Sequence, residues 1–202
     1  MIRASGRAPS WLCASSGAPD DVRRPGDHGA PRDGASDRSL STRIMRIALE
    51  SPDQPEVIAL IDALDAYQIP LYPAESHHGI DIAALCRPEV LFAVARTEGR
   101  EAVACGAIVL TPKYGELKRM FTRPDHRGRG VAGRLLGFLE AEAAARGCLC
   151  FMLETGYLQP EALGLYERFG YRRRGPFGDY VEDPNSVFMH KRIGLPHPRD
   201  AG

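Results

Sequence analysis

The sequence has little of what would place the protein in a membrane, on nucleic acid or outside the cell. No window of its 202 residues approaches the run of about 20 apolar residues that a membrane-spanning helix needs. Lys and Arg number 26 and Asp and Glu number 26, so net charge provides no general attraction to nucleic acid. The cysteines lack metal-ligand spacing, and their odd number is typical of buried thiols in a reducing compartment: Cys13, Cys86, Cys105, Cys148 and Cys150. We therefore expect a cytoplasmic protein with no metal, no nucleic-acid partner and no membrane segment.

The first 44 residues lack sustained apolar periodicity and contain no apolar segment of the kind found in secretory signals. They are rich in Gly, Pro, Arg, Ser and Asp, and Trp11 stands alone as an apolar point. Such a segment cannot bury enough surface to offset the entropy lost on ordering. We predict a disordered tail over residues 1–44, with Met45 as an alternative translation start, one domain over residues 45–192 and a flexible tail over residues 193–202.

Hydrophobic patterning after Met45 indicates a mixed α/β domain. A broken, aromatic loop is expected from Gln68 to Ile80 because Pro70 and Pro73 interrupt it. The continuous apolar run from 148 to 153 predicts a central strand covered on both faces. The pattern predicts helices over 57–64, 82–85, 130–146 and 160–169, and strands over 46–49, 91–96, 102–110, 116–122, 148–153, 171–174 and 186–191.

A turn rich in glycine and arginine joins the strand at 116–122 to the helix that follows. Glycine lets the backbone approach a ligand closely, and the start of a helix directs unpaired N–H groups and a positive dipole end at an anion. Arginine adds charge-assisted hydrogen bonds to phosphate. We predict a phosphate cradle formed by Arg127, Gly128, Arg129, Gly130, Val131, Ala132 and Gly133.

Two other classes of glycine-rich turn also bind phosphate and could explain this segment. A Walker loop needs Lys and Ser or Thr after its last glycine, whereas Val131 and Ala132 follow Gly130. The glycine spacing also fits a dinucleotide-binding turn, which leaves a nicotinamide-dependent oxidoreductase as a second reading. The preceding strand argues against it, because it alternates polar and apolar residues where a first Rossmann strand is almost continuously apolar.

The chain resembles the GNAT superfamily of acetyl-CoA-dependent N-acetyltransferases over roughly Met45 to Arg192. That family binds the coenzyme A pyrophosphate with the pattern Arg/Gln-x-x-Gly-x-Gly/Ala, which Arg127, Gly130 and Ala132 fill. Thr122, Arg123 and Pro124 resemble the family's strand end and turn. A second signature, Ala-x-x-Leu-Tyr-x-x-x-Gly-Phe/Tyr, is matched in the same order by Ala162, Leu165, Tyr166, Gly170 and Tyr171.

The resemblance implies a mixed, mostly antiparallel sheet flanked by helices, with a splayed pair of parallel strands that holds acetyl-CoA. It also implies transfer of the acetyl group to a primary amine by direct attack in a ternary complex. The balanced charge and the polar, aromatic loop from Tyr67 to His78 favour a small or amino-acid-like acceptor. A protein N-terminus or lysine, a non-catalytic coenzyme A-binding module and a homodimer remain open.

Two carboxylates are candidates for the base that takes the amine proton. Glu116 lies eleven residues before Arg127, where several family members keep a base, and strand alternation puts it on one face with Lys118, Met120 and Thr122. Its alternative role is a surface ion pair with Lys118 or Arg119. Glu154 ends the following strand, where open α/β sheets bind ligands, but Glu154, Thr155 and Gly156 also suit a turn.

The remaining assignments follow from the resemblance. Tyr166 matches the tyrosine that protonates the departing thiolate, and a phenol is a proton donor at neutral pH. Gln159 stands where the family often has Asn, which puts that contact to the pantetheine arm in question. Backbone N–H groups of Met120, Phe121 and Thr122 would hold the oxyanion. We expect His77 and His78 to be solvated loop side chains, because they lack the spacing of metal ligands. Asp179 and Tyr180 belong either to the acceptor pocket or to a turn.

Overall fold

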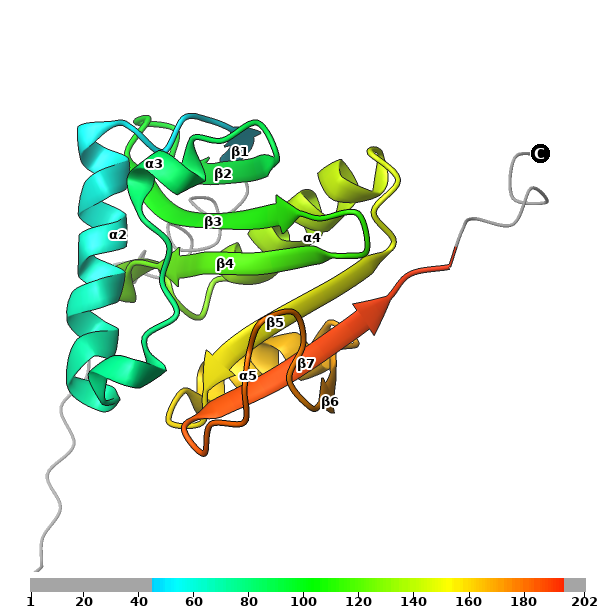
Figure 1. Ribbon diagram of the computed structural model, residues 1–202. Coiled ribbons are helices and arrows are strands. Elements are labelled where there is room, and N and C mark those ends of the chain that lie inside the picture. Colours follow the sequence, from blue (N-terminus) through cyan, green and yellow to red (C-terminus); the bar gives the residue numbers. More distant parts are fainter. Residues whose placement is uncertain (1–44, 195–202) are drawn as a thin grey trace, which may run out of the picture. The chain divides into compact units, whose positions relative to one another are not determined.

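The computed structural model describes residues 45–194, so the predictions for residues 1–44 and 195–202 lie outside the described residues. Within that range the chain forms a seven-stranded sheet in the order β1-β2-β3-β4-β5-β7-β6 (Figure 1). One neighbouring pair, β4 with β5, is parallel, and the others are antiparallel. The predicted fold class is confirmed. The strands are β1 Arg46–Leu49, β2 Val90–Arg96, β3 Ala102–Leu110, β4 Gly115–Thr122, β5 Cys150–Gly156, β6 Arg172–Arg174 and β7 Ser186–Arg192.

Helices cover both faces of this sheet and create a separate core on each. The core on one face includes Leu135, Leu139 and Leu163, and the core on the other includes Val57 and Leu60. No helix among residues 45–194 is long and apolar enough to cross a membrane. The α-helices are α2 Pro55–Gln68, α3 Ile82–Leu85, α4 Val131–Ala144 and α5 Pro160–Arg168, and short 3₁₀ turns lie at Ile69–Leu71, Ala74–Ser76 and Pro124–His126.

A β-bulge in β4 changes which face each of its side chains occupies. Cys105 pairs with Phe121 and Ala107 with Lys118, so β4 carries one more residue than β3 over this interval. Arg119 absorbs the extra length with a φ of 56°. Such a bulge shifts the period-two alternation by one residue.

The predicted common face for four residues of β4 is therefore wrong beyond the bulge. Glu116 and Lys118 lie on the α2 face, since Lys118 pairs with Ala107 of the α2 core. Met120 packs against the α4 core, and Thr122 follows it on that face. Gly106 of β3 makes room for this arrangement, because a Cβ there would lie 2.3 Å from the Met120 sulfur.

The strand β5 differs from its prediction in extent and in burial. It begins at Cys150 and continues through Gly156, so Glu154 to Gly156 belong to a strand and not to a turn. Phe151 and Leu153 are buried in the α4 core, but Met152 and Glu154 are only half-buried. The expected cover on both faces is wrong, because these two side chains lie on one face of β5 and are not fully covered.

The parallel pair separates after a short stretch. Gly115 pairs with Phe151, Glu116 with Met152 and Leu117 with Leu153, and the pairing ends there. Figure 1 shows β4 and β5 running apart beyond this point. The predicted splayed pair is thus present, and it divides the sheet into a β1–β4 half and a β5-β7-β6 half.

A buried polar cluster connects α4 to the β5-β7-β6 half. The Tyr171 hydroxyl donates a hydrogen bond to Glu140 of α4 at 2.8 Å, and Lys191 of β7 donates to the same carboxylate at 2.6 Å. Only 8% of Glu140 is exposed. Its negative charge therefore depends on these two partners, because an unpaired buried carboxylate is strongly destabilising.

We expect Lys191→Met to lower the free energy of unfolding by about 3–5 kcal/mol, because Glu140 would lose its cationic partner. Arg146→Gln is the control, since it breaks the exposed Glu142–Arg146 pair and should cost less than about 1 kcal/mol. Urea unfolding followed by far-ultraviolet circular dichroism measures both. Equal losses in the two variants would contradict a structural role for the cluster.

Candidate active site

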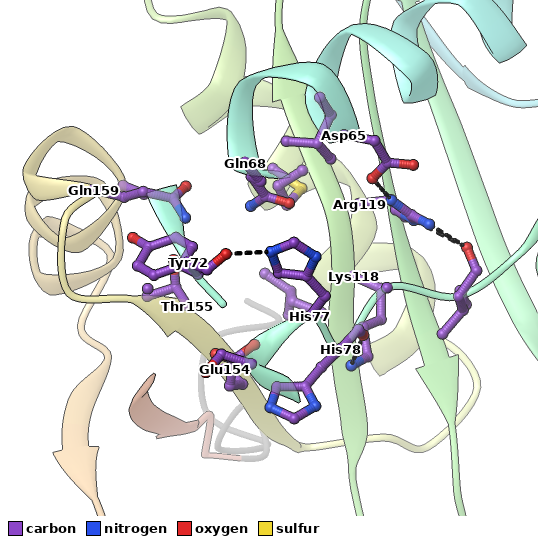
Figure 2. A pocket seen from close by; sticks show the side chains of 18 of the residues that line it. Asp65, Gln68, Tyr72, His77, His78, Lys118, Arg119, Glu154, Thr155 and Gln159 are labelled. Carbon is purple, nitrogen blue, oxygen red and sulfur yellow. Dashed lines mark hydrogen bonds and ion pairs between the residues drawn. The ribbon is translucent and has the colours of Figure 1, made fainter. Parts of the chain in front are cut away.

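A pocket of about 430 Å³ lies where β4 and β5 separate. Figure 2 shows that its side chains come from both strands, from α5 and from the loop after α2. Strand separation has opened the space, and the loop after α2 borders it. The lining includes Leu117 to Met120 of β4, Glu154 to Gly156 of β5, and Gln159, Ala162 and Tyr166 at α5.

Residues 69–81, here called the acceptor loop, are attached to β4 at the bulge. The Lys118 ammonium donates to the carbonyl of His78 at 3.1 Å, and Nε of Arg119 donates to the carbonyl of Ile80 at 3.0 Å. Gly79 lets the guanidinium of Arg119 lie against the loop, because a Cβ there would be 2.8 Å from its Nη2. The bulge thus fixes one wall of the pocket.

Tyr72 attaches the same loop to the other half of the sheet. Its hydroxyl accepts a hydrogen bond from the Leu158 amide at 3.1 Å, and its ring lies over Gly156, where a Cβ would be 2.0 Å from the hydroxyl oxygen. His77 donates from Nε2 to the Tyr72 carbonyl at 3.1 Å (Figure 2). The acceptor loop therefore spans the opening between the two separated strands.

Glu154 faces the pocket, as one of the two base assignments requires. Its Oε1 accepts a hydrogen bond from the Ser186 hydroxyl at 2.7 Å. Burial raises the pKa of this carboxyl above its ordinary value, and the Ser186 bond and the charges of His78 and Lys118 only partly oppose that. A carboxylate with a raised pKa accepts a proton more readily near neutral pH.

Glu116, the other candidate base, does not line the pocket. Its Oε1 lies 2.8 Å from the Lys118 ammonium and accepts a hydrogen bond from the Tyr180 hydroxyl at 2.7 Å. Lys118 also donates to the Tyr180 hydroxyl. Tyr180 packs edge-on against His78 at 5.0 Å, which places this phenol beside the pocket. The structure holds Glu116 in the ion pair that the sequence offered as its other role.

Tyr166 lies at the inner end of the pocket on α5 and is only 6% exposed. Burial and the nearby negative charge of Glu154 raise the pKa of its phenol. The phenol therefore keeps its proton at neutral pH and can act as a donor. Gln159, at the N-cap position of α5, is also buried, and its side chain hydrogen-bonds Tyr72.

The predicted cradle lies between the end of β4 and the start of α4. Gly128 and Gly130 have φ of 71° and 75°, a conformation in which L side chains are strained. Gly130 is the N-cap of α4, and no side chain within the described range caps this helix, so the N–H groups of its first turn remain available to a ligand. Gly133 differs, because a Cβ there would lie 2.8 Å from the Phe169 ring. Its role is to pack α4 against α5.

Arg127 and Thr122 lie on the β4 side of the cradle. Nε of Arg127 donates to the Thr122 carbonyl at 3.0 Å, and its guanidinium lies 5.7 Å from the Tyr67 ring and 5.9 Å from the Phe121 ring. The Thr122 hydroxyl is buried and has no hydrogen-bond partner among residues 45–194. A buried hydroxyl of this kind suits a ligand that supplies the missing partner.

Nothing in the sequence neighbourhood of several residues that line the pocket or contact its lining signals a site. Asp65 looks like an ordinary polar residue of an amphipathic helix, yet it pairs with Arg119 across the pocket wall. Ser186 looks like a strand start, yet it holds Glu154. Tyr72 lies in an aromatic loop with no motif around it, yet it contacts Leu158 and Gly156. Tertiary contacts between distant segments give all three their positions.

The comparisons with known proteins agree with this geometry. Residues 57–171 match the model of the acetyltransferase (GNAT) family. A protein of Azospirillum brasilense named IAA acetyltransferase is 48% identical over 149 residues, which cover 73% of this chain and 97% of that protein. The crystal structure of a candidate acyl-CoA N-acyltransferase from Klebsiella pneumoniae is 40% identical, covers 74% of this chain and 98% of its own, and has a TM-score of 0.64.

A more distant likeness concerns the fold alone. The crystal structure of an aminoglycoside 6'-N-acetyltransferase complexed with coenzyme A is 20% identical, covers 76% of this chain and 99% of its own, and has a TM-score of 0.59. The family match spans more than half of the chain, and the similar proteins are covered almost completely. We conclude that the chain belongs to the GNAT family and is an acetyltransferase.

Proposed function

We propose that the enzyme transfers the acetyl group of acetyl-CoA to the primary amine of a small acceptor. One observation carries the proposal: a half-buried carboxylate and a buried phenol, Glu154 and Tyr166, line one pocket at the separation of β4 and β5. The cradle at the start of α4 follows the carboxyl end of the same strand β4, the end toward which β4 separates from β5. Family membership supplies the acetyl transfer.

The cradle would bind the pyrophosphate of acetyl-CoA. Backbone N–H groups at the start of α4 and the positive end of its dipole favour an anion there. The positive φ values at 128 and 130 favour glycine, so neither position places a side chain there. Arg127 would add charge-assisted hydrogen bonds, since its guanidinium is already held beside the cradle by the Thr122 carbonyl.

In the proposed reaction the acceptor first loses a proton to Glu154. The amine nitrogen then bonds to the thioester carbonyl carbon, and the carbon–sulfur bond breaks. Tyr166 gives its proton to the departing sulfur, and the nitrogen loses its second proton as the amide forms, which returns a proton to Tyr166 through solvent. The backbone N–H groups of β4 from Met120 to Thr122 would hold the oxyanion, since this part of β4 has lost its β5 partner.

We expect Gly130→Ala to weaken acetyl-CoA binding at least tenfold, because a Cβ would enter the cradle and strain the backbone. Gly147→Ala is a matched control. Gly147 follows α4 at its other end, has a φ of 84° and, like Gly130, has open space around its Cβ position. Isothermal titration with acetyl-CoA measures both variants. Similar affinities in the two would remove the cradle assignment.

We expect Glu154→Gln to reduce turnover most near neutral pH and least at high pH, where the acceptor amine is already neutral. Wild-type activity should rise with pH through the raised pKa of Glu154, because only the ionised carboxylate accepts a proton. Rate profiles against pH measure this. Glu116→Gln is the comparison, and a larger pH-dependent loss there would assign the base to Glu116.

Glu154→Gln should also change the stability of the folded protein, which can be measured without an activity assay. Since the pKa of Glu154 is higher in the folded than in the unfolded chain, the folded state holds more protons, and stability falls as pH rises through that window. Glu154→Gln should therefore raise the melting temperature at pH 7–8. The gain should shrink toward pH 4, where the carboxyl is protonated in both states.

We expect Tyr166→Phe to leave acetyl-CoA affinity nearly unchanged while turnover falls by about 10²–10⁴-fold, as for other lost general acids. Tyr171→Phe is the control, because Tyr171 contacts the Tyr166 ring but bonds Glu140 instead of facing the pocket. Full turnover in Tyr166→Phe would mean that the thiolate leaves without protonation by this residue.

A further inference from the structure

We propose that the acceptor is an amine that carries no carboxylate, with uncharged polar groups in the rest of its body. The inference rests on the proposed function and concerns the same pocket. It follows from the charges of the pocket walls. Amino-acid-like acceptors would need a free cation to bind their carboxylate. Both cationic side chains that the lining contains among residues 45–194, Lys118 and Arg119, already have anionic partners.

The ammonium group of Lys118 has three polar partners in the described part of the chain. Its ammonium lies 2.8 Å from the Glu116 carboxylate, donates to the His78 carbonyl at 3.1 Å and donates to the Tyr180 hydroxyl. Its side chain is 13% exposed and that of Glu116 is 15% exposed, so solvent screens this pair weakly. A carboxylate in the pocket would have to displace one of these partners.

Arg119 is occupied in a similar way. Its guanidinium pairs with Asp65 of α2, and its Nε and Nη2 donate to the Ile80 carbonyl at 3.0 and 2.6 Å (Figure 2). Its side chain is 9% exposed. The charge of Arg119 is therefore compensated within the pocket wall, and the residue serves to hold the acceptor loop.

The acidic groups of the lining exceed the cationic ones once these pairs are formed. Glu154 accepts a hydrogen bond from Ser186, and Asp81 accepts one from the Ala84 amide at 2.7 Å, but neither belongs to an ion pair in the described part of the chain. The field in the pocket therefore favours an ammonium group and opposes a carboxylate.

Amide and imidazole side chains supply much of the rest of the polar lining. Three amides and two imidazoles can bind hydroxyl, amide or ether groups, beside apolar surface from Leu64, Ile69 and Ile80. This set suits an uncharged polar body attached to the amine. These residues are Gln68, Gln159, Asn185, His77 and His78.

The test compares ω-amino acids with the corresponding amides as acceptors at pH 8, above the ordinary titration range of imidazole. The wild-type enzyme should prefer the amide at least tenfold in kcat/KM. Asp65→Asn removes the partner charge of Arg119 with little change of shape. It should reduce this preference at least tenfold, because Arg119 can then bind the carboxylate.

Two controls separate the effect of charge on the amide-to-acid preference from other causes. The change in preference between wild type and variant cancels the different acidity of the two amines and any loss of folded enzyme. Glu50→Gln makes the same change in net charge but removes a partner of Arg96, which does not line this pocket, so the preference should stay as in wild type.

The outcomes separate the inference from the proposed function. A wild-type preference for the carboxylate-bearing acceptors, or an Asp65→Asn preference equal to that of wild type, would overturn the inference while acetyl transfer stands. Absence of turnover with every amine, in enzyme that still binds acetyl-CoA, would overturn the proposed function and the inference with it.

Discussion

The short parallel contact between β4 and β5 is the constraint on which the rest of the structure depends. Three residues of β4 pair with β5, and beyond Leu117 the two strands run apart. Everything assigned to the site lies in or beside the space that this creates. The separation would expose strand edges and divide the sheet, so other elements must hold it together. The acceptor loop bridges it through Tyr72, and α4 bridges it through Glu140 and Lys191.

The bulge at Arg119 determines where the charged side chains of β4 lie relative to the space between the strands. It directs Lys118 and Arg119 toward the acceptor loop, and it turns Met120 to the opposite face. Both cationic side chains hold the loop, and both are paired, Lys118 with Glu116 and Arg119 with Asp65. The uncompensated negative charge of the pocket is thus a consequence of how its wall is built.

The sequence predicted the parts of this molecule that local patterns control. The helices, most strands and the glycine turn at Gly128 and Gly130 follow from hydrophobic periodicity and from the need for positive φ. It failed where a residue's position depends on distant partners. The bulge depends on pairing with β3, so the face occupied by Met120 could not be counted from β4 alone. Whether Glu116 or Glu154 faces the pocket depended on that same tertiary arrangement.

The reversal of side-chain direction at Arg119 lets one strand serve two purposes. Residues before the bulge, such as Glu116 and Lys118, lie on the α2 face with the acceptor loop, whereas Met120 and Thr122 lie on the face that leads to the cradle. In the proposed arrangement, substitutions on the first set would change the acceptor side of the site and leave the coenzyme side in place. Acceptor choice would then diverge in evolution or in the laboratory while the acetyl donor stays the same.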